Sequence, residues 1–215
     1  SLVEALNLRS VILQNFEKAL HTTDINERKA LMSFVIVGGG ATGVELAGAL
    51  AELKRYILPK DYPDLDLCTM QIHLILCGDR LLPAMSEKAS ESSEKFLRKM
   101  GVNVWLKVRA KDYDGHALYT NDETYYTKTV VWTAGVQGVP TPGLNAEMTK
   151  SCRVVVDEYN RIKGYEDIFA IGDVAAHLCE ETPYGLPMLA SVAVQQGTYL
   201  GKNLNRLAKE KDMKP

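Results

Sequence analysis

The sequence predicts an α/β protein built on a Rossmann-like parallel sheet, into which an antiparallel β-meander is inserted. Three observations lead to this fold class. An apolar run at residues 34–37 passes through a glycine-rich turn into a helical pattern. Strand-like and helix-like segments then alternate as β-α-β-α-β, which is typical of parallel sheets covered by helices. Finally, the turn signals Asp114-Gly115 and Asn121-Asp122 separate short strand-like runs, as in a meander.

The composition is that of a globular chain with a sizeable core, because 46% of its 215 residues are hydrophobic. The formal net charge is −2, so the sequence gives no reason to expect nucleic-acid binding. The four cysteines form no CxxC pair, and we expect reduced thiols and no metal site. Residues 34–53 form a long apolar window, but the four glycines of a turn and Glu45 argue against a membrane span there.

The first half of the chain is expected to contain helices and strands in alternation. Residues 1–20 have the spacing of an amphipathic helix, opened by a capping box at Ser1, and residues 21–29 are expected to form a polar linker. The elements expected next are a strand at 33–37, a helix at 41–57, a strand at 71–76, a helix at 87–100 and a strand at 103–107.

The second half begins with the meander, expected at 117–120 and 125–131, after which the segment TVVWTAG returns the chain to the sheet. The Pro/Gly-rich stretch from Gly135 to Gly143 predicts a domain boundary. Short strands at 153–156 and 168–171 and a helix at about 189–208 are expected beyond it. We therefore expect three parts: a connecting helix and linker (1–32), a dinucleotide-binding domain (33–136) and a smaller C-terminal part (137–215).

The glycine turn has the pattern Gly38-x-Gly40-x-x-Gly43 between a strand and a helix. In a dinucleotide-binding turn the first glycine permits the tight bend, the second lets the backbone approach a pyrophosphate, and the third lets helix and strand pack closely. The helix N-terminus then offers unpaired N–H groups to the anion. The alternative is an ordinary glycine-rich β-α turn, but the flanking strand and helix favour a nucleotide site.

The dinucleotide fingerprint also calls for an acid at the end of the second strand, where it binds the adenosine ribose. Here that position is Leu76, and the strand comes late after a long connection. Asp79 could bind the ribose hydroxyls, or Arg80 could meet a 2′-phosphate. Alternatively, both are solvated loop charges.

Three further segments, YEDIFAIGDVA (165–175), VVWTAGV and LPMLASVAVQQGTYLGKNL, carry a family resemblance. Together with GGGATGVELAGALAEL and GDRLLP, they resemble the type II, non-proton-pumping NADH dehydrogenases, which belong to the pyridine nucleotide-disulfide oxidoreductase superfamily. The resemblance runs along essentially the whole chain. It implies that NAD(H) and FAD are the cofactors, that 33–136 is the NADH-binding domain, and that 137–215 is the return half of a FAD-binding domain.

The resemblance also implies roles for individual residues. Glu45 is expected near the nicotinamide and flavin and, with Gln195, in catalysis; the bland alternative for Glu45 is a charge that stabilises the helix dipole. Ser191 and Gln195 are expected to line a quinone site, although Ser191 stands where the family has a longer glutamine. The expected cofactor-binding residues are Gly38, Gly39, Gly40, Gly43, Asp79, Gly135, Gly172 and Asp173. Asp173 would hold a flavin ribityl hydroxyl, or else be a turn aspartate.

The function implied is that of an NADH:quinone oxidoreductase, in which hydride passes from NADH to FAD and electrons then pass to a membrane quinone. The chain resembles a soluble fragment that lacks the family's N-terminal FAD-binding segment and C-terminal membrane tail. The full-length protein is expected as a homodimer, peripheral on the cytoplasmic face of the inner membrane. Two alternatives stay open: a soluble flavoprotein reductase of a redox protein or disulfide, and an NADH-binding regulatory domain without turnover.

Overall fold

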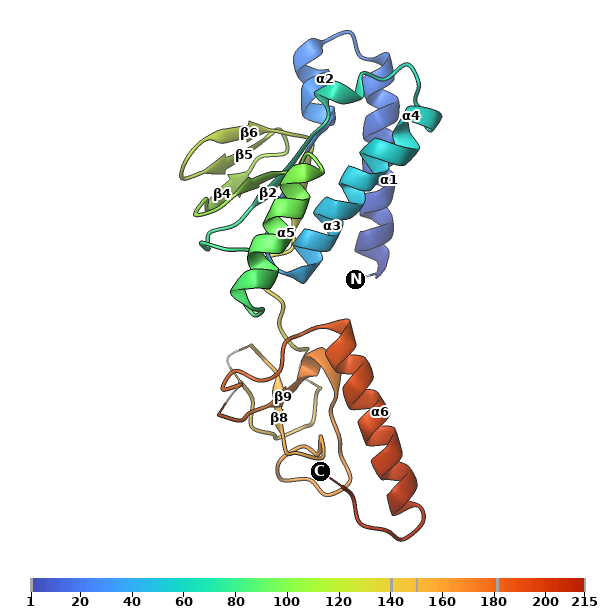
Figure 1. Ribbon diagram of the computed structural model, residues 1–215, viewed down its shortest axis with the longest axis vertical. Helices are drawn as coiled ribbons and strands as arrows, with labels where there is room; N and C mark the ends of the chain where they lie inside the picture. The colour runs from blue at the N-terminus through green and yellow to red at the C-terminus, as the bar shows by residue number, and fades with distance from the viewer. Residues whose placement is uncertain (1, 140, 150, 181, 215) are drawn as a thin grey trace. The chain divides into compact units, whose positions relative to one another are not determined.

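The computed structural model describes residues 2–139, 141–149, 151–180 and 182–214 of the chain (Figure 1). The capping box expected at Ser1 therefore lies outside the described residues. The chain divides into two compact units, Ser1–Gly135 and Val136–Pro215.

A four-stranded parallel sheet forms the centre of the first unit. Its strands are β1 (Ser33–Val37), β2 (Gln71–Ile75), β3 (Asn103–Trp105) and β7 (Thr129–Trp132), in the order β3-β2-β1-β7. Val37 at the end of β1 pairs with Ile75 on one side and with Trp132 on the other. The carboxyl ends of β2, β1 and β7 therefore meet at one edge of the sheet, and the predicted α/β fold class is confirmed.

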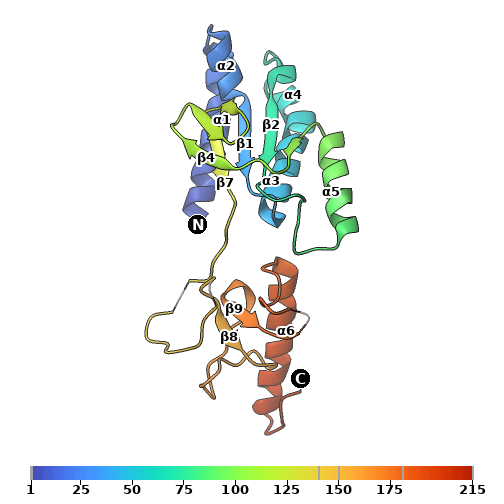
Figure 2. The same ribbon diagram turned by 90° about the vertical axis from the view of Figure 1, so that its left-hand side faces the viewer.

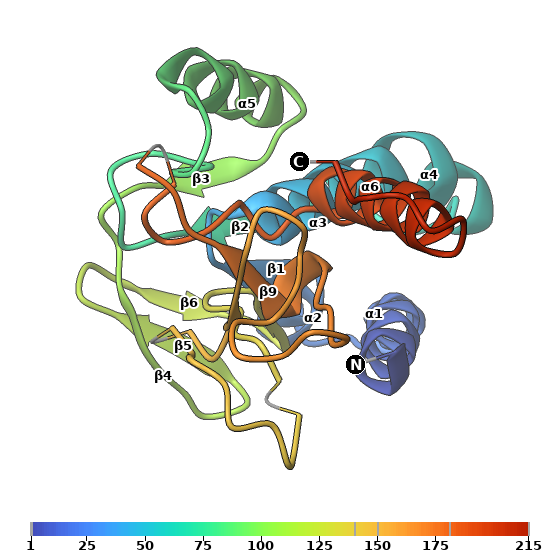
Figure 3. The ribbon, with the colours of Figure 1, turned by 90° about the horizontal axis from the view of Figure 1, so that it is seen from below.

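Helices cover one face of this sheet and the meander covers the other (Figures 1 and 3). The helices are α1 (Leu2–His21), α3 (Ala41–Glu52) and α5 (Glu87–Lys99). Side chains alternate along β1: Phe34 and Ile36 pack with the helices, whereas Val35 and Val37 pack with the meander. Both sides of β1 are thus buried, as its unbroken apolar sequence predicts.

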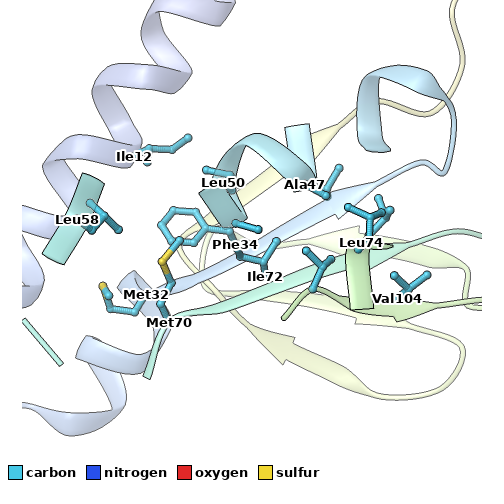
Figure 4. Close-up of a cluster of buried hydrophobic side chains, with 14 of the residues drawn as sticks. Ile12, Met32, Phe34, Ala47, Leu50, Leu58, Met70, Ile72, Leu74 and Val104 are labelled. Carbon is cyan, nitrogen blue, oxygen red and sulfur yellow. The ribbon is translucent and has the colours of Figure 1, made fainter. Parts of the chain in front are cut away.

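The core on the helical face is built around Phe34 (Figure 4). The rings of Phe34 and Phe16 lie 5.5 Å apart between centroids, and Ile12 and Leu50 belong to the same cluster. Helix α1 therefore packs on the sheet of the first unit through its second half, while Val3 and Leu6 in its first half are exposed.

Residues 21–29, expected as a polar linker, contain the start of a second helix, α2 (Ile25–Leu31). Asp24 caps it, because its carboxylate accepts a hydrogen bond from the backbone N–H of Asn26 at 2.8 Å. The linker interpretation was wrong beyond Asp24, since the capping aspartate and the buried Ala30 and Leu31 outweigh the polar composition.

The helix expected at 41–57 is longer and less regular than predicted. Helix α3 is followed by a π-turn, η1 (Leu53–Ile57), and by α4 (Leu58–Asp61). The cause is Pro59, which has no N–H to donate and whose ring would collide with the carbonyl four residues earlier in a regular α-helix. A short 3-10 turn, η2 (Leu67–Thr69), then leads into β2.

The meander contains the strands β4 (Ala110–Tyr113), β5 (Ala117–Thr120) and β6 (Thr124–Tyr126). Strand β4 was not predicted, and the run expected at 125–131 is divided between β6 and β7. Thr127 divides it: this buried hydroxyl donates to the backbone carbonyl of Ser33, which anchors the chain where it leaves the meander for the parallel sheet.

The second unit contains a two-stranded parallel sheet and one long helix (Figure 2). Its elements are β8 (Val154–Val156), the 3-10 turn η3 (Gly172–Val174), β9 (Ala175–His177) and α6 (Ala190–Leu207). The strand expected at 168–171 is reduced to an isolated antiparallel bridge between Phe169 and Arg161, and the pairing with β8 comes instead from the buried alanines of β9. Among the described residues of either unit, no helix combines the length and apolar character needed to cross a bilayer.

Candidate functional site

The first and third glycines of the GxGxxG turn are required by packing. Gly38 has φ +125°, and a Cβ there would lie 2.7 Å from both the backbone nitrogen of Ala134 and Oγ1 of Thr133. A Cβ on Gly43 would overlap the carbonyl oxygen of Gly38. These two positions hold strand β1 and helix α3 together, as the fingerprint predicts.

The second glycine, Gly40, is different, because no atom lies within 4 Å of the Cβ that it lacks. Gly40 is exposed and is the N-cap residue of α3, with φ −76°, and no side chain caps the helix. The N–H groups of the first turn of α3 therefore have no capping side chain, and an anion can bind them. The structure thus leaves room where a pyrophosphate would need it.

Thr133 supports this turn from the neighbouring strand, and the sequence did not single it out. Its hydroxyl lies 3.0 Å from the carbonyl oxygen of Val37 and 3.3 Å from that of Gly38, and its backbone N–H donates to Val37 at 2.8 Å. The signal in the sequence was its place at the end of the returning strand, in TVVWTAG. Gly135, expected to bind the cofactor, follows two residues later, exposed and with φ +87°.

The end of β2 carries no carboxylate. Leu76 is only 7% exposed, and its Cδ1 lies 2.5 Å from the position a Cβ would take on Gly39. Asp79 is exposed in the loop that follows. The guanidinium of Arg80 donates to the carbonyls of Pro83, at 2.8 Å, and Met85, at 3.3 Å, so its hydrogen bonds hold this loop in shape.

Glu45 is exposed on α3. It lies beyond the first turn of α3, which contains no acid, so stabilisation of the helix dipole is also a weak explanation for it. Its solvated position leaves the side chain free to face a bound molecule.

In the second unit, Gly172 and Asp173 form a turn that is held by Gln196 of α6. The backbone N–H of Gly172, which has φ +71°, donates to Oε1 of Gln196 at 2.7 Å. Gln196 is 8% exposed, whereas the carboxylate of Asp173 lies at the surface. The sequence offered one sign of this role, which is that Gln196 is a polar residue at the spacing of the apolar face of α6.

A buried cation lies behind the same turn. Arg153 is 4% exposed, and its guanidinium donates to the carbonyls of Ala175, at 2.5 Å, and Leu186, at 2.8 Å. Burial lowers the pKa of the Arg153 guanidinium, and the nearby carboxylate of Asp173 opposes this effect. Arg153 therefore ties the segment before α6 to β9 and contributes a positive charge near Asp173.

The two residues expected to line a quinone site, Ser191 and Gln195, are both exposed on α6. The two neighbouring glutamines of this helix thus differ, with Gln196 turned into the unit and Gln195 at its surface.

A cavity of about 420 Å³ lies at the other end of the parallel sheet, near the first residues of β1 and β2, Ser33 and Gln71. It contains none of the glycines of the turn. His73 lines it and accepts a hydrogen bond from the indole N–H of Trp105 at 3.0 Å. Burial lowers the pKa of His73, and the carboxylate of Glu123 opposes this. Over the described residues, no three His, Cys, Asp or Glu side chains converge as a metal site.

Comparison with known proteins places these features in a family. Residues 8–197 match the family described as Pyridine nucleotide-disulphide oxidoreductase. The chain is similar to Type II NADH:quinone oxidoreductase Ndh of Mycobacterium tuberculosis, with 30% identity over 217 residues that cover 95% of this chain and 45% of that protein. It is also similar to NdhA of the same organism, a protein of the same description, with 31% identity over 97% of this chain and 46% of that protein. The chain thus spans about half the length of the curated relatives it matches.

Among solved structures, NDH2 from Plasmodium falciparum in complex with NADH matches with a TM-score of 0.67 and 24% identity, over 82% of this chain and 38% of that one. At that identity the likeness shows the fold. A NAD-dependent persulfide reductase from A. fulgidus matches with a TM-score of 0.60 and 26% identity, over 80% of this chain and 30% of that one. The resemblance to type II NADH dehydrogenases is confirmed by the relatives, and since the family match extends over most of the chain, the chain belongs to the pyridine nucleotide-disulphide oxidoreductase family.

Proposed function

We propose that the protein containing this chain is a FAD-dependent NADH:quinone oxidoreductase, and that the first unit supplies its NADH site. The observation that carries the proposal is the open space at Gly40, at the uncapped N-terminus of α3. Membership of the family supports it, as do the names of the relatives. The proposed domains follow: NADH binding by 33–136, after a connecting segment 1–32, and part of a FAD-binding domain in 137–215.

The proposed role of the glycine turn is to hold the dinucleotide in place. The backbone at Gly40 and the first N–H groups of α3 would bind the pyrophosphate, with Gly39 and Gly135 shaping the space around it. Because Gly38 and Gly43 fix the turn against β1 and β7, the site needs little rearrangement to bind. Orientation of this kind is the protein's main contribution when a cofactor carries out the redox step.

The second unit has groups that fit one end of a flavin. The carboxylate of Asp173 is exposed and, within the described part of the chain, accepts no hydrogen bond, so it can accept one from a ribityl hydroxyl. Gln196 and Arg153 hold the turn that presents it. When bound, FAD would supply the hydride acceptor and the route of electrons to quinone. Glu45 and Gln195, both exposed, are the proposed groups for positioning reactants and handling protons.

Further parts of the proposal concern the whole protein. Ser191 and Gln195 are proposed to border the quinone site; the shorter Ser191 would make its lining less polar than a glutamine would. The proposed location is peripheral, on the cytoplasmic face of the inner membrane, through a membrane-associating tail, and the proposed assembly is a homodimer.

The test is to purify the full-length protein, determine its flavin content, and measure NADH oxidation with and without a soluble quinone. The proposal predicts about one FAD per chain and oxidation that depends on quinone. Bound FAD with activity only towards a disulfide or a redox protein would favour the soluble reductase. Binding of NADH without flavin or turnover would favour a regulatory domain.

A further inference from the structure

The adenosine end of the proposed dinucleotide site lacks the charge that usually rejects a 2′-phosphate. In sites specific for NADH, an acid at the end of the second strand binds the ribose hydroxyls. Here Leu76 takes that place, and its side chain is buried beneath Gly39. The nearest acid that follows, Asp79, is exposed three residues further along the loop. No carboxylate is therefore fixed at the ribose position to repel a phosphate.

The segment after β3 runs beside this loop and brings a lysine to it. The backbone N–H of Lys107 donates to the carbonyl of Gly78 at 2.8 Å, and that of Val108 donates to Leu76 at 3.0 Å. Lys107 has φ +59°, a conformation that residues other than glycine seldom adopt. The two hydrogen bonds place Lys107 at the same edge of the sheet as the ribose position at the end of β2.

The charge of Lys107 is available to a ligand. Its side chain is exposed and, over the described residues, makes neither an ion pair nor a hydrogen bond. Arg80 contributes a second positive charge, although its hydrogen bonds go to loop carbonyls. With Asp79 as the acid of this loop, the formal charge of the three residues is two positive and one negative, or +1 in total.

We propose that this site accepts the 2′-phosphorylated dinucleotide NADPH as well as NADH, and that Lys107 is the residue that favours the phosphate. The inference rests on the proposed function, because it assumes that the glycine turn binds a nicotinamide dinucleotide. A phosphate monoester carries close to two negative charges at neutral pH, so a nearby lysine attracts it. Because Lys107 is solvated, its effect is limited to about fivefold in affinity and is screened by salt.

The test is to titrate the 215-residue chain with NADH and with NADPH, following the fluorescence of the reduced nicotinamide at low and at physiological salt. The two dissociation constants should lie within about tenfold of each other, since no fixed carboxylate separates them. Lys107→Glu, at a solvated position, should weaken NADPH binding by about tenfold while changing NADH binding by about twofold or less. The matched control is Lys111→Glu, on the exposed side of β4, which should change neither.

Two results would overturn this inference while leaving the proposed NADH site intact. The first is that the chain binds NADH but binds NADPH about a hundredfold or more weakly. The second is that Lys107→Glu loses affinity for both dinucleotides equally. A NADPH preference that does not weaken with added salt would also contradict the role given to Lys107. If neither dinucleotide binds, the proposed NADH site is wrong and this inference falls with it.

Discussion

Replacing Gly40 by valine should weaken dinucleotide binding severely without unfolding the first unit. No atom lies within 4 Å of a Cβ at this position, and φ is −76°, so the side chain enters open space without strain. The side chain would occupy the volume that a pyrophosphate needs. If two charge-assisted hydrogen bonds to backbone N–H groups are lost, at about 1.5–3 kcal/mol each, binding weakens by roughly 3–6 kcal/mol, or about a hundred- to ten-thousandfold.

The assay is calorimetric titration of the wild-type and variant chains with NADH, together with thermal denaturation. Valine is a poorer N-cap residue than glycine, so the variant should lose about 1 kcal/mol of unfolding free energy. Gly201→Val is the matched control, since a Cβ on Gly201 of α6 also meets no atom within 4 Å; it should leave NADH binding unchanged. A folded Gly40→Val variant that binds NADH with wild-type affinity would refute the site.

Gly43→Ala should instead destabilise the first unit by about 3 kcal/mol or more, measured by denaturant unfolding, because its methyl group overlaps the carbonyl of Gly38. Burial lowers the pKa of His73 in the folded protein, so the unfolded chain takes up a proton first as the pH drops below about 6.5, the ordinary pKa of histidine. The stability of the first unit should therefore fall below that pH. His73→Gln, whose side chain can still accept the hydrogen bond from Trp105, should flatten this dependence when unfolding is measured as a function of pH. Gln196→Leu removes the acceptor for the N–H of Gly172, so it should loosen the Gly172–Asp173 turn; under the flavin role proposed for Asp173, it should also weaken FAD retention in the full-length protein, measured by flavin release on dilution. The 215-residue chain by itself should bind NADH and carry little FAD, as its absorbance spectrum would show, because its sequence has one GxGxxG turn and that turn is assigned to NADH.

The parts of the fold that could be predicted are those in which local pattern and packing agree. Strand β1, the glycine turn and the start of α3 follow from an apolar run, glycines at fixed spacing and a helical pattern, and the structure has them at the expected residues. The buried side chains of β1 show why its sequence lacks alternation: each face has its own covering layer.

The parts that could not be predicted depend on contacts between residues far apart in the sequence. In the second unit, the strand that pairs with β8 begins at Ala175 and not at Ile168, and its residues Ala175 and Ala176 are fully buried beside β8. Likewise, the spacing of the apolar face of α6 marks Gln196 and not Gln195 as the inward glutamine, but the sequence does not show that its partner is the backbone N–H of Gly172. The exposure of Glu45 depends on which side of α3 packs on the sheet, and the many small apolar residues of this helix leave that side poorly marked.

The most direct test of the central claim is to measure the two half-reactions of the full-length protein separately, without oxygen. NADH should bleach the visible absorbance of the bound flavin, and a quinone added afterwards should restore it. The same experiment with Gly40→Val should show a wild-type flavin spectrum that NADH bleaches only at far higher concentration, while quinone still reoxidises flavin that has been reduced chemically. Two results would contradict the account: NADH rapidly bleaches the flavin of the Gly40→Val variant, or the reduced flavin stays bleached after quinone is added.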